Sequence, residues 1–314
     1  MSVSGLACVG VGMSDRHARN ARVEWPTLGL ILVCYGAFLM GTTWLAGISS
    51  LAGICLLTVA LALHSSLSHE VLHGHPVPSR WLSEALVFPA IGLFIPYIRF
   101  RDSHLAHHQD SILTDPYDDP ETNYLDPKVW RQLPDWKCLV YRINNTLLGR
   151  LTIGPILGQI RFMAADFQAI RAGDVAVLKG WLWHIPALVP VLWWMFFVSS
   201  LSVSAYLFSA YAALSILKIR TFLEHQAHER ARARTVVIED KGPLAWIFLN
   251  NNLHVVHHMH PRVPWYKLPR LFRENRARYL ARNDSYYFRS YAQVFRQYLW
   301  RAKDPVPHPL WPQK

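Results

Sequence analysis

The sequence has little charge and little cysteine. Charged residues make up 17% of its 314 residues, whereas hydrophobic residues make up 52%. This composition is too apolar for an ordinary soluble protein and excludes a disordered or nucleic-acid-binding tail, so we expect no nucleic-acid partner. The chain has four cysteines, and no two of them form a CxxC pair. We therefore expect neither a disulfide framework nor a cysteine-based metal site, and a reducing compartment fits better than an oxidising one.

Two long stretches of the chain lack charge altogether, at residues 25–69 and 180–217. One membrane crossing needs about 20 apolar residues, so each stretch is long enough for two crossings. The first stretch predicts helices over 27–46 and 49–68, and the second is broken by polar residues at 199–202. Each stretch predicts a transmembrane helical hairpin rather than a buried hairpin in a soluble core.

A third apolar stretch, residues 85–98, is shorter and contains two prolines. As a helix it would span about 21 Å, which is less than the roughly 30 Å of a hydrocarbon core. Pro89 and Pro96 also interrupt it. We therefore expect an interfacial or re-entrant helix here rather than a full crossing.

The formal charge of +11 is distributed in a way that indicates the orientation of the chain. Basic residues precede the first hairpin, lie between the hairpins and follow the second, whereas the predicted hairpin turns carry none. By the positive-inside rule, the N-terminal tail, the central segment and the C-terminal segment all face the cytoplasm. The first 24 residues lack the short apolar core of a secretory signal, so we expect a cytosolic tail.

Together these features predict an all-α integral membrane protein. We expect four transmembrane helices in two hairpins, an interfacial or re-entrant helix and a cytosolic helical cap. The expected parts are a cytosolic tail over 1–24, a membrane catalytic domain over 25–275 and a basic cytosolic segment over 276–314. The protein is expected to be a multi-pass protein of the inner (cytoplasmic) membrane, with its site on the cytoplasmic face.

Histidine is the unusual residue of this chain. There are 16 histidines, about twice the number that average compositions give. Half of them fall in three boxes, which follow the second predicted crossing, the short apolar stretch and the second hairpin. Residues three or four apart lie on one face of a helix, so each box can point its imidazoles one way. If the stretch 85–98 crossed the membrane, the first two boxes would lie on opposite sides. The box histidines are His69, His73, His104, His107, His108, His254, His257 and His258.

Neutral imidazole binds iron, zinc, copper or nickel rather than magnesium or calcium. His225 is a ninth candidate ligand, because it follows the fourth predicted crossing, although it could also be a surface histidine at a helix end. One ion takes about four to six ligands, so this many imidazoles indicates two metal ions. Nearby carboxylates are expected either to accept hydrogen bonds from imidazole N–H groups or to be surface charges. They are Glu70, Asp102, Asp110, Asp115, Asp119 and Glu224.

The remaining histidines are expected to have other roles. His64 lies five residues before the first box, which turns it about 140° away around a helix, so we expect it to pack or to line a pore. His75, His228 and His260 neighbour the boxes without matching box positions, and they are expected in the surroundings of the site or in solvent. Ordinary packing or exposure is expected for His17, His184 and His308.

Several segments of the sequence together resemble one known family. They are His69-Glu-Val-Leu-His73, His104-Leu-Ala-His-His108, Arg220-Thr-Phe-Leu-Glu-His225 and Asn250-Asn-Asn-Leu-His-Val-Val-His-His258, followed by Pro264-Trp-Tyr-Lys-Leu-Pro269. This pattern resembles the membrane-bound fatty acid desaturases, a superfamily that also includes alkane hydroxylases and carotene ketolases and hydroxylases. The resemblance covers about residues 28–275.

The resemblance implies a four-crossing helical fold and a cytosolic centre of two iron ions held by histidines, with O2 as co-substrate. It implies that His225 is a metal ligand. It also implies that one of Asn250 to Asn252 holds a metal-bound water, so Asn250 and Asn251 join the residues expected around the site.

The implied activity is O2-dependent attack on an unactivated C–H bond with two external electrons, and we expect desaturation of a fatty acyl chain. Hydroxylation or ketolation of an alkane, a carotenoid or another lipid or hydrocarbon substrate is the alternative. A metal transporter or sensor is a third hypothesis, although transport requires ligands near the bilayer midplane. The sequence contains no haem-binding His-Pro-Gly-Gly element and no Rossmann glycine fingerprint. A separate ferredoxin- or rubredoxin-like protein is therefore expected to donate the electrons.

Overall fold

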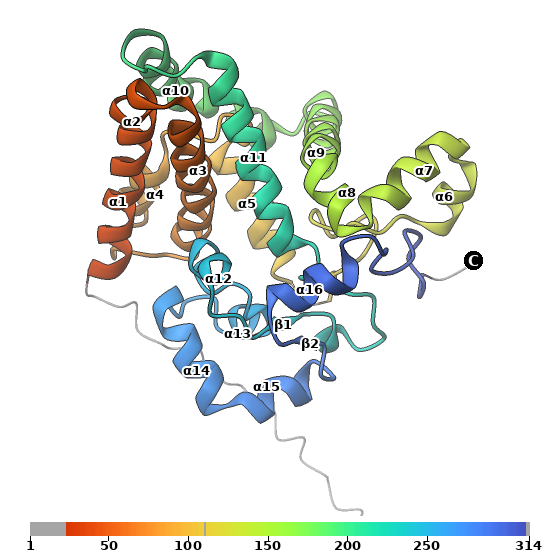
Figure 1. Ribbon diagram of the computed structural model, residues 1–314. Coiled ribbons are helices and arrows are strands. Elements are labelled where there is room, and N and C mark those ends of the chain that lie inside the picture. Colours follow the sequence, from red (N-terminus) through yellow and green to blue (C-terminus); the bar gives the residue numbers. More distant parts are fainter. Residues whose placement is uncertain (1–22, 110, 312–314) are drawn as a thin grey trace, which may run out of the picture.

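The computed structural model describes residues 23–109 and 111–311, which are mostly helical (Figure 1). His17, Asp110 and nearly all of the predicted N-terminal tail lie outside the described residues. The mostly helical fold predicted from the sequence is confirmed. Long helices stand side by side as a bundle in the upper part of Figure 1. The bundle contains α1 (Trp25–Thr42), α2 (Trp44–Ile48), α3 (Ser50–Leu72), α4 (Arg80–Val87), α5 (Tyr97–His107), α10 (Val175–Phe197) and α11 (Val203–Thr221).

Two further groups of elements adjoin the bundle. One extends to its side in Figure 1 and consists of α6 (Pro127–Gln132), α7 (Asp135–Asn144), α8 (Leu147–Thr152) and α9 (Gly154–Arg171). The other lies below the bundle and is called the cap here. The cap contains η1 (Ala231–Ala233), β1 (Val237–Ile238), α12 (Pro243–Ile247), α13 (His254–Met259), η2 (Trp265–Lys267), α14 (Leu268–Glu274), α15 (Arg276–Arg282), β2 (Tyr287–Phe288) and α16 (Tyr291–Tyr298).

Three helical stretches are long and apolar enough to cross a membrane: Trp25–Ile48, which combines α1 and α2, Ser50–Leu72 and Val175–Phe197. The hydroxyl groups of Ser49 and Ser202 cap the helices that follow them, so α3 and α11 begin next to the predicted breaks. The fourth predicted crossing, α11, is a helix of 19 residues with two basic residues in its last turn. It is not among the candidate spans found in the described residues, and it stays a prediction.

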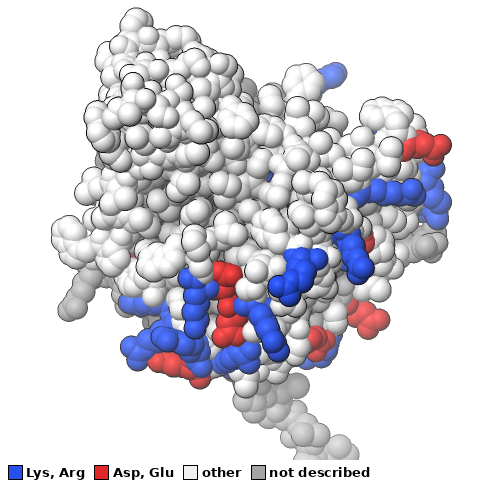
Figure 2. Space-filling view, viewed as in Figure 1, with Lys and Arg blue, Asp and Glu red and all other residues white. Residues whose placement is uncertain are grey.

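Charge is divided between the bundle and the rest of the molecule. Lys, Arg, Asp and Glu gather over the cap and over the side extension in Figure 2, whereas the visible surface over α1, α2 and the upper part of α11 is uncharged. Apolar side chains are exposed on these helices, including Leu32 on α1 (73%) and Phe208 on α11 (61%). A continuous apolar surface of this kind is stable against hydrocarbon rather than water, which indicates a membrane protein.

The prediction of one helix over residues 85–98 is wrong. Helix α4 ends at Val87, helix α5 begins at Tyr97, and the residues between them are irregular. Pro89 and Pro96 have no backbone N–H group, so neither can donate the hydrogen bond that a continuous helix requires.

Residues 88–96 are instead held by hydrogen bonds from neighbouring helices. His184, in the middle of α10, is hydrogen-bonded through Nε2 to the carbonyl oxygen of Leu93 at 2.7 Å. Gln159 on α9 donates to the carbonyl oxygen of Phe94 at 2.9 Å. Irregular backbone is tolerated at membrane depth only where protein groups satisfy its polar atoms. These contacts fit a segment that turns back inside the bundle.

Small residues allow the first two long helices to pack closely. A Cβ atom added to Gly53 on α3 would lie 2.7 Å from the carbonyl oxygen of Gly41 and 3.0 Å from the Cα atom of Ala46. Glycine and alanine at such contacts let helix backbones approach one another in membrane proteins, where lipid gives no hydrophobic driving force for association. The close approach therefore depends on the absence of a side chain at Gly53.

The C-terminal part of the chain is built into the cap. Strand β2 pairs in parallel with β1, and Tyr291 and Val294 of α16 share a buried core with Leu147 and Phe222. The predicted domain boundary at residue 275 thus separates elements that pack against one another. As a boundary between domains it stays a prediction.

We predict that Gly53→Ala destabilises the protein, because the new methyl group collides with backbone atoms that cannot move away independently. The expected cost is about 1–3 kcal/mol, typical of overpacking. The thermal unfolding midpoint of the detergent-solubilised protein measures it. Gly36→Ala on α1 is the matched control, because nothing lies within 4 Å of a Cβ atom there. Equal midpoints for the two variants would contradict the prediction.

Candidate metal centre

The first histidine box lies where the bundle meets the cap. Helix α3 continues to Leu72, beyond the predicted end at residue 68, so His69 lies inside the helix and His73 is its C-cap residue. Residues four apart lie on one helix face, and the centroids of these two rings are 5.0 Å apart. The long apolar helix thus carries the first pair of imidazoles directly to the cap.

The second box divides its histidines between two directions, although we expected each box to point them one way. The Nε2 atoms of His104 and His108 lie 2.9 Å apart, whereas His107 belongs to a different group. On a helix, residues i+3 and i+4 are about 100° apart around the axis. One direction therefore suits the outer pair of the box but not its middle member.

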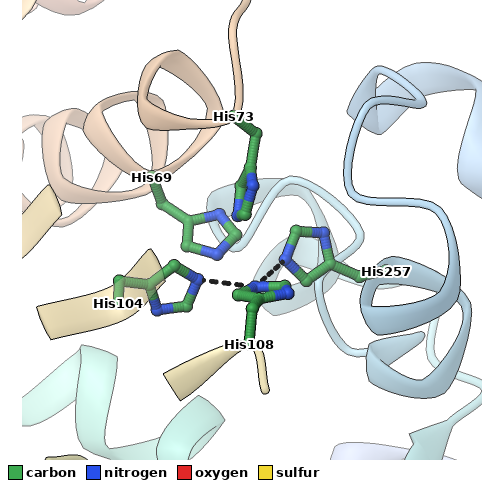
Figure 3. A group of neighbouring side chains, drawn as sticks. All are labelled: His69, His73, His104, His108 and His257. Carbon is green, nitrogen blue, oxygen red and sulfur yellow. Dashed lines mark hydrogen bonds between the residues drawn. The ribbon is translucent and has the colours of Figure 1, made fainter. Parts of the chain in front are cut away.

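The third box, on α13, divides as well: its middle histidine joins the outer pair of the second box, and its outer pair joins His107. Nine histidines thereby form two groups. Figure 3 shows the first group, whose rings come from α3, from α5 and its C-cap, and from α13, and surround a common centre. All nine histidines predicted from the sequence are brought together. The first group is His69, His73, His104, His108 and His257; the second group is His107, His225, His254 and His258.

The distances between ring nitrogens fit metal coordination. Within each group, the candidate ligand atoms lie within 4.8 Å of one another. In the first group, His108 Nε2 and His257 Nε2 are 3.1 Å apart. In the second group, His107 Nε2 and His225 Nε2 are 2.9 Å apart. Two nitrogens bound to one ion at right angles, with bonds of about 2.1 Å, lie about 3 Å apart.

Burial of the rings supports the same interpretation. The Nε2 atoms of His69 and His73 are buried and have no hydrogen-bond partner among the described residues. Buried polar atoms are nearly always satisfied, because an unpaired one costs free energy. A bound metal ion would satisfy these nitrogens.

Several rings are fixed from their far side. When Nδ1–H donates a hydrogen bond, the neutral ring keeps its Nε2 lone pair for a metal, and the ring orientation is held. In each pair found here, a side-chain oxygen faces Nδ1 of a histidine. The pairs are His104 with Glu121 (2.9 Å), His107 with Asp119 (2.7 Å) and His254 with Asn251 (3.0 Å).

Two of the residues expected around the site, Asp119 and Asn251, are therefore hydrogen-bonded to box histidines. Glu224 lies next to the second group: its carboxylate is 3.9 Å from His254 Nδ1 and 2.9 Å from Nε of Arg220. The ion pair with Arg220 compensates for the burial of Glu224 beside neutral imidazoles.

Glu70, Asn250 and Asp102 take other places. The Glu70 carboxylate accepts a hydrogen bond from the backbone N–H of Trp265 at 2.7 Å, and the Asn250 side chain donates to the Trp265 carbonyl at 3.1 Å. Glu70 therefore ties the segment around residue 265 to the first box, whereas Asn250 ties it to the turn before α13. Asp102 takes the second place expected for it, that of a surface charge: its carboxylate pairs with Arg101 at 2.8 Å. Asp102 precedes His104 by two residues on α5, so the two side chains lie about 200° apart around the helix axis.

Glu121 is a contact that the sequence analysis missed. Its carboxylate oxygens lie 2.9 Å from His104 Nδ1 and 3.8 Å from His107 Nε2, so it touches both groups. Its position could have indicated this contact, because Glu121 lies in the acidic loop after the second box, two residues beyond the candidate Asp119.

Histidines outside the two groups have other partners. His75 is buried with Nδ1 at 2.8 Å from Glu24. Burial alone would lower the pKa of His75, but Glu70 and Glu24 outweigh burial and raise it. His64 is buried beside Tyr35, whose hydroxyl oxygen lies 3.4 Å from His64 Nε2. His228 Nε2 lies 3.2 Å from the Asp284 carboxylate, and His308 Nε2 lies 3.2 Å from the Thr114 hydroxyl group. The ring of His260 meets the ring of Tyr279 edge-on, with centroids 6.2 Å apart.

The electrostatics differ between histidines of the two groups. Burial and neighbouring imidazoles hold the pKa of His254 and of His257 well below the usual range, which keeps both rings in the form that ligates. Burial would also lower the pKa of His107, but Glu121 and Asp119 outweigh it and raise the value to about 9. A metal ion bound to His107 therefore displaces a proton, so binding weakens as the pH falls.

The sequence profile described as "Fatty acid desaturase" matches residues 18–291. The chain belongs to the fatty acid desaturase family. The resemblance inferred from the sequence is thus confirmed, and family membership indicates an oxidoreductase. A "Beta-carotene ketolase" of Paracoccus sp. (strain PC1) is 25% identical over 277 residues, which cover 82% of this chain and 97% of that protein. A second "Beta-carotene ketolase", from Paracoccus sp. (strain N81106 / MBIC 01143), is 25% identical over 71% of this chain and 77% of its own length.

In this desaturase-family protein, we predict that Asp119→Asn weakens metal binding by about 10- to 100-fold, because His107 loses the charged acceptor that fixes its ring. Competition titration of the purified protein with a chelator of known affinity measures the change. Asp118→Asn is the matched control, because it removes an exposed carboxylate from the same loop. Equal metal affinity in the two variants would show that Asp119 has no role in holding the ring.

Proposed function

We propose that this protein is a membrane-bound di-iron oxidoreductase that uses O2 and two external electrons to oxidise an unactivated C–H bond of an apolar substrate. One observation carries the proposal: nine imidazoles from four separate parts of the chain converge in two adjacent groups, each able to hold a metal ion. The groups adjoin, since the rings of His108 and His258 stack with their centroids 4.2 Å apart. Membership of the desaturase family supports the reaction class.

The all-imidazole donor set suits iron, zinc or copper. We propose iron, because the reaction transfers electrons and zinc does not change its oxidation state. Two iron ions held by the first and second groups would supply the redox chemistry that activates O2. The protein would supply the rest: Glu121 and Asp119 hold the rings by their Nδ1 atoms, and burial excludes bulk water.

The position of the site suits a substrate that arrives from the bilayer. Helix α3 is apolar along most of its length and ends in the first box, so apolar side chains such as Leu67 and Val71 lie next to the metal ligands. We propose that the substrate chain lies in an apolar tunnel lined by residues of the bundle. A charged or strongly hydrated molecule would lose its hydration there without compensation.

The orientation and the electron donor complete the proposal. We propose that the cap faces the cytoplasm from the inner membrane, in keeping with the Lys and Arg side chains that gather over it in Figure 2. A separate ferredoxin- or rubredoxin-like protein would then deliver electrons from the cytoplasmic side. An acidic protein of that class has the charge that complements the cap.

Two reactions fit this site. Desaturation of a fatty acyl chain follows from the resemblance to desaturases. Hydroxylation or ketolation of a carotenoid or another apolar substrate fits equally, and the two Paracoccus relatives named "Beta-carotene ketolase" favour it. The reactions share the removal of a hydrogen from carbon and differ in whether a second hydrogen leaves or an oxygen is added.

We predict that expression in a host that contains both fatty acids and β-carotene yields a new product that depends on the box histidines. Mass spectrometry of lipid extracts distinguishes loss of two hydrogens, which indicates desaturation, from gain of oxygen, which indicates hydroxylation or ketolation. His107→Ala should abolish the product with membrane insertion intact. His228→Ala, outside both groups, should retain it. Equal product from wild type and His107→Ala would exclude His107 as a ligand.

We also predict that the purified protein, loaded anaerobically with ferrous iron, holds about two iron ions per chain, one for each histidine group. Elemental analysis of protein in detergent measures the ratio. Less than one iron per chain together with full occupancy by zinc would overturn the di-iron proposal.

A further inference from the structure

Residues 299–308, called the C-terminal strap here, lie against the loop that carries His225, a member of the second histidine group. The strap follows α16, and its backbone is hydrogen-bonded to two other parts of the chain. Leu148 N–H donates to the Leu299 carbonyl at 3.0 Å, and His308 N–H donates to the Leu125 carbonyl at 2.8 Å. From the sequence alone, this part of the chain is predicted only to be part of a basic cytosolic segment.

Lys303 links the strap directly to a metal-ligand residue. Its Nζ atom donates to the backbone carbonyl of His225 at 2.9 Å and lies 3.6 Å from the Asp304 carboxylate. The side chain is only 5% exposed. A buried ammonium is costly, and an apolar side chain of similar length would fill the same space without that cost. The two oxygen groups that face the ammonium, the His225 carbonyl and the Asp304 carboxylate, compensate for its burial.

Asp304 anchors the strap on the other side of the same loop. Its carboxylate accepts a hydrogen bond from the hydroxyl group of Tyr124. The Tyr124 oxygen in turn accepts one from the backbone N–H of Ala227 at 2.9 Å. The loop that begins at His225 is therefore held at residue 225 by Lys303 directly and at residue 227 by Asp304 through Tyr124.

The strap also reaches His107. His308 Nε2 lies 3.2 Å from the hydroxyl group of Thr114, and the backbone N–H of Thr114 donates to the Asp119 carboxylate at 2.9 Å. Asp119 holds the ring of His107 at 2.7 Å. Two of the four histidines of the second group are thus connected to the strap.

We propose that the C-terminal strap is a clasp for the second histidine group and that Lys303 is a positioning residue for His225. The proposal rests on the proposed function, because it assumes that both groups hold metal ions. The geometry leaves little tolerance: His225 Nε2 lies 2.9 Å from His107 Nε2 and 3.2 Å from His254 Nε2. A small displacement of the His225 backbone would move its nitrogen out of the shared coordination position.

Release of iron to a chelator from the full-length, iron-loaded protein tests the proposal. Lys303→Met keeps the length of the side chain and removes the donor to His225. We expect one of the two ions to leave about 10- to 100-fold faster than in wild type, while the other leaves at the wild-type rate. Lys303→Arg retains a donor and should restore much of the slow release. Lys241→Met, an exposed lysine in the cap, is the matched control and should change nothing.

Release of both ions at wild-type rates from Lys303→Met would overturn the proposal, and so would equal acceleration of both. If Lys303→Met does not fold, iron release is measured from Thr114→Val instead. This variant removes only the hydroxyl group that contacts His308. Faster loss of one ion supports the clasp, and unchanged release refutes it. Wild-type protein that binds fewer than two ions would refute the proposed function instead.

Discussion

Nine imidazole rings lie close together in the protein interior, and their ring nitrogens face one another at distances of about 3 Å in several pairs. Neutral rings in this arrangement present lone pairs to one another, and buried nitrogens such as those of His69 and His73 have no hydrogen-bond partner among the described residues. Such an arrangement is unfavourable by itself and becomes favourable when a cation binds between the rings. The helices and loops around the rings hold them in this arrangement.

The arrangement needs support on the side of each ring that faces away from the centre. Glu121 and Asp119 come from one loop, and Asn251 comes from the turn before α13. That loop is in turn bonded to the end of the chain through Thr114 and His308. The two histidine groups are therefore supported by residues far from the boxes in sequence, including residues of the C-terminal part of the chain.

The geometry of the α-helix explains how three boxes make two groups. A box with histidines at positions i, i+3 and i+4 cannot direct all three rings to one point, because the last two are about 100° apart. His107, the middle member of the second box, therefore joins the outer histidines of the third box, and His257, the middle member of the third box, joins the first box and the outer histidines of the second. Two adjacent sites follow from two such boxes that face each other, each contributing ligands to both.

Much of this could be predicted from the sequence. The charge-free stretches predicted the long apolar helices, since the hydrophobic requirement for a span is local in sequence. The histidine spacing predicted eight residues that meet, because helix periodicity is local as well. The position of His225 and the family resemblance added the ninth, and the number of imidazoles indicated two metal ions. The contacts of Asp119 and Asn251 could also be predicted, because both residues lie close to boxes in the chain.

Other features were decided only by the tertiary structure. The irregular course of residues 88–96 depends on hydrogen bonds from α9 and α10, and Asp102 turns away from the rings although it lies beside a box. Which histidine belongs to which group depends on how α5 and α13 face one another. The contact of Lys303 with His225 joins residues that are far apart in the chain. A sequence pattern predicts features that depend on residues close together in the chain. These contacts depend instead on how distant segments pack, which no local pattern predicts.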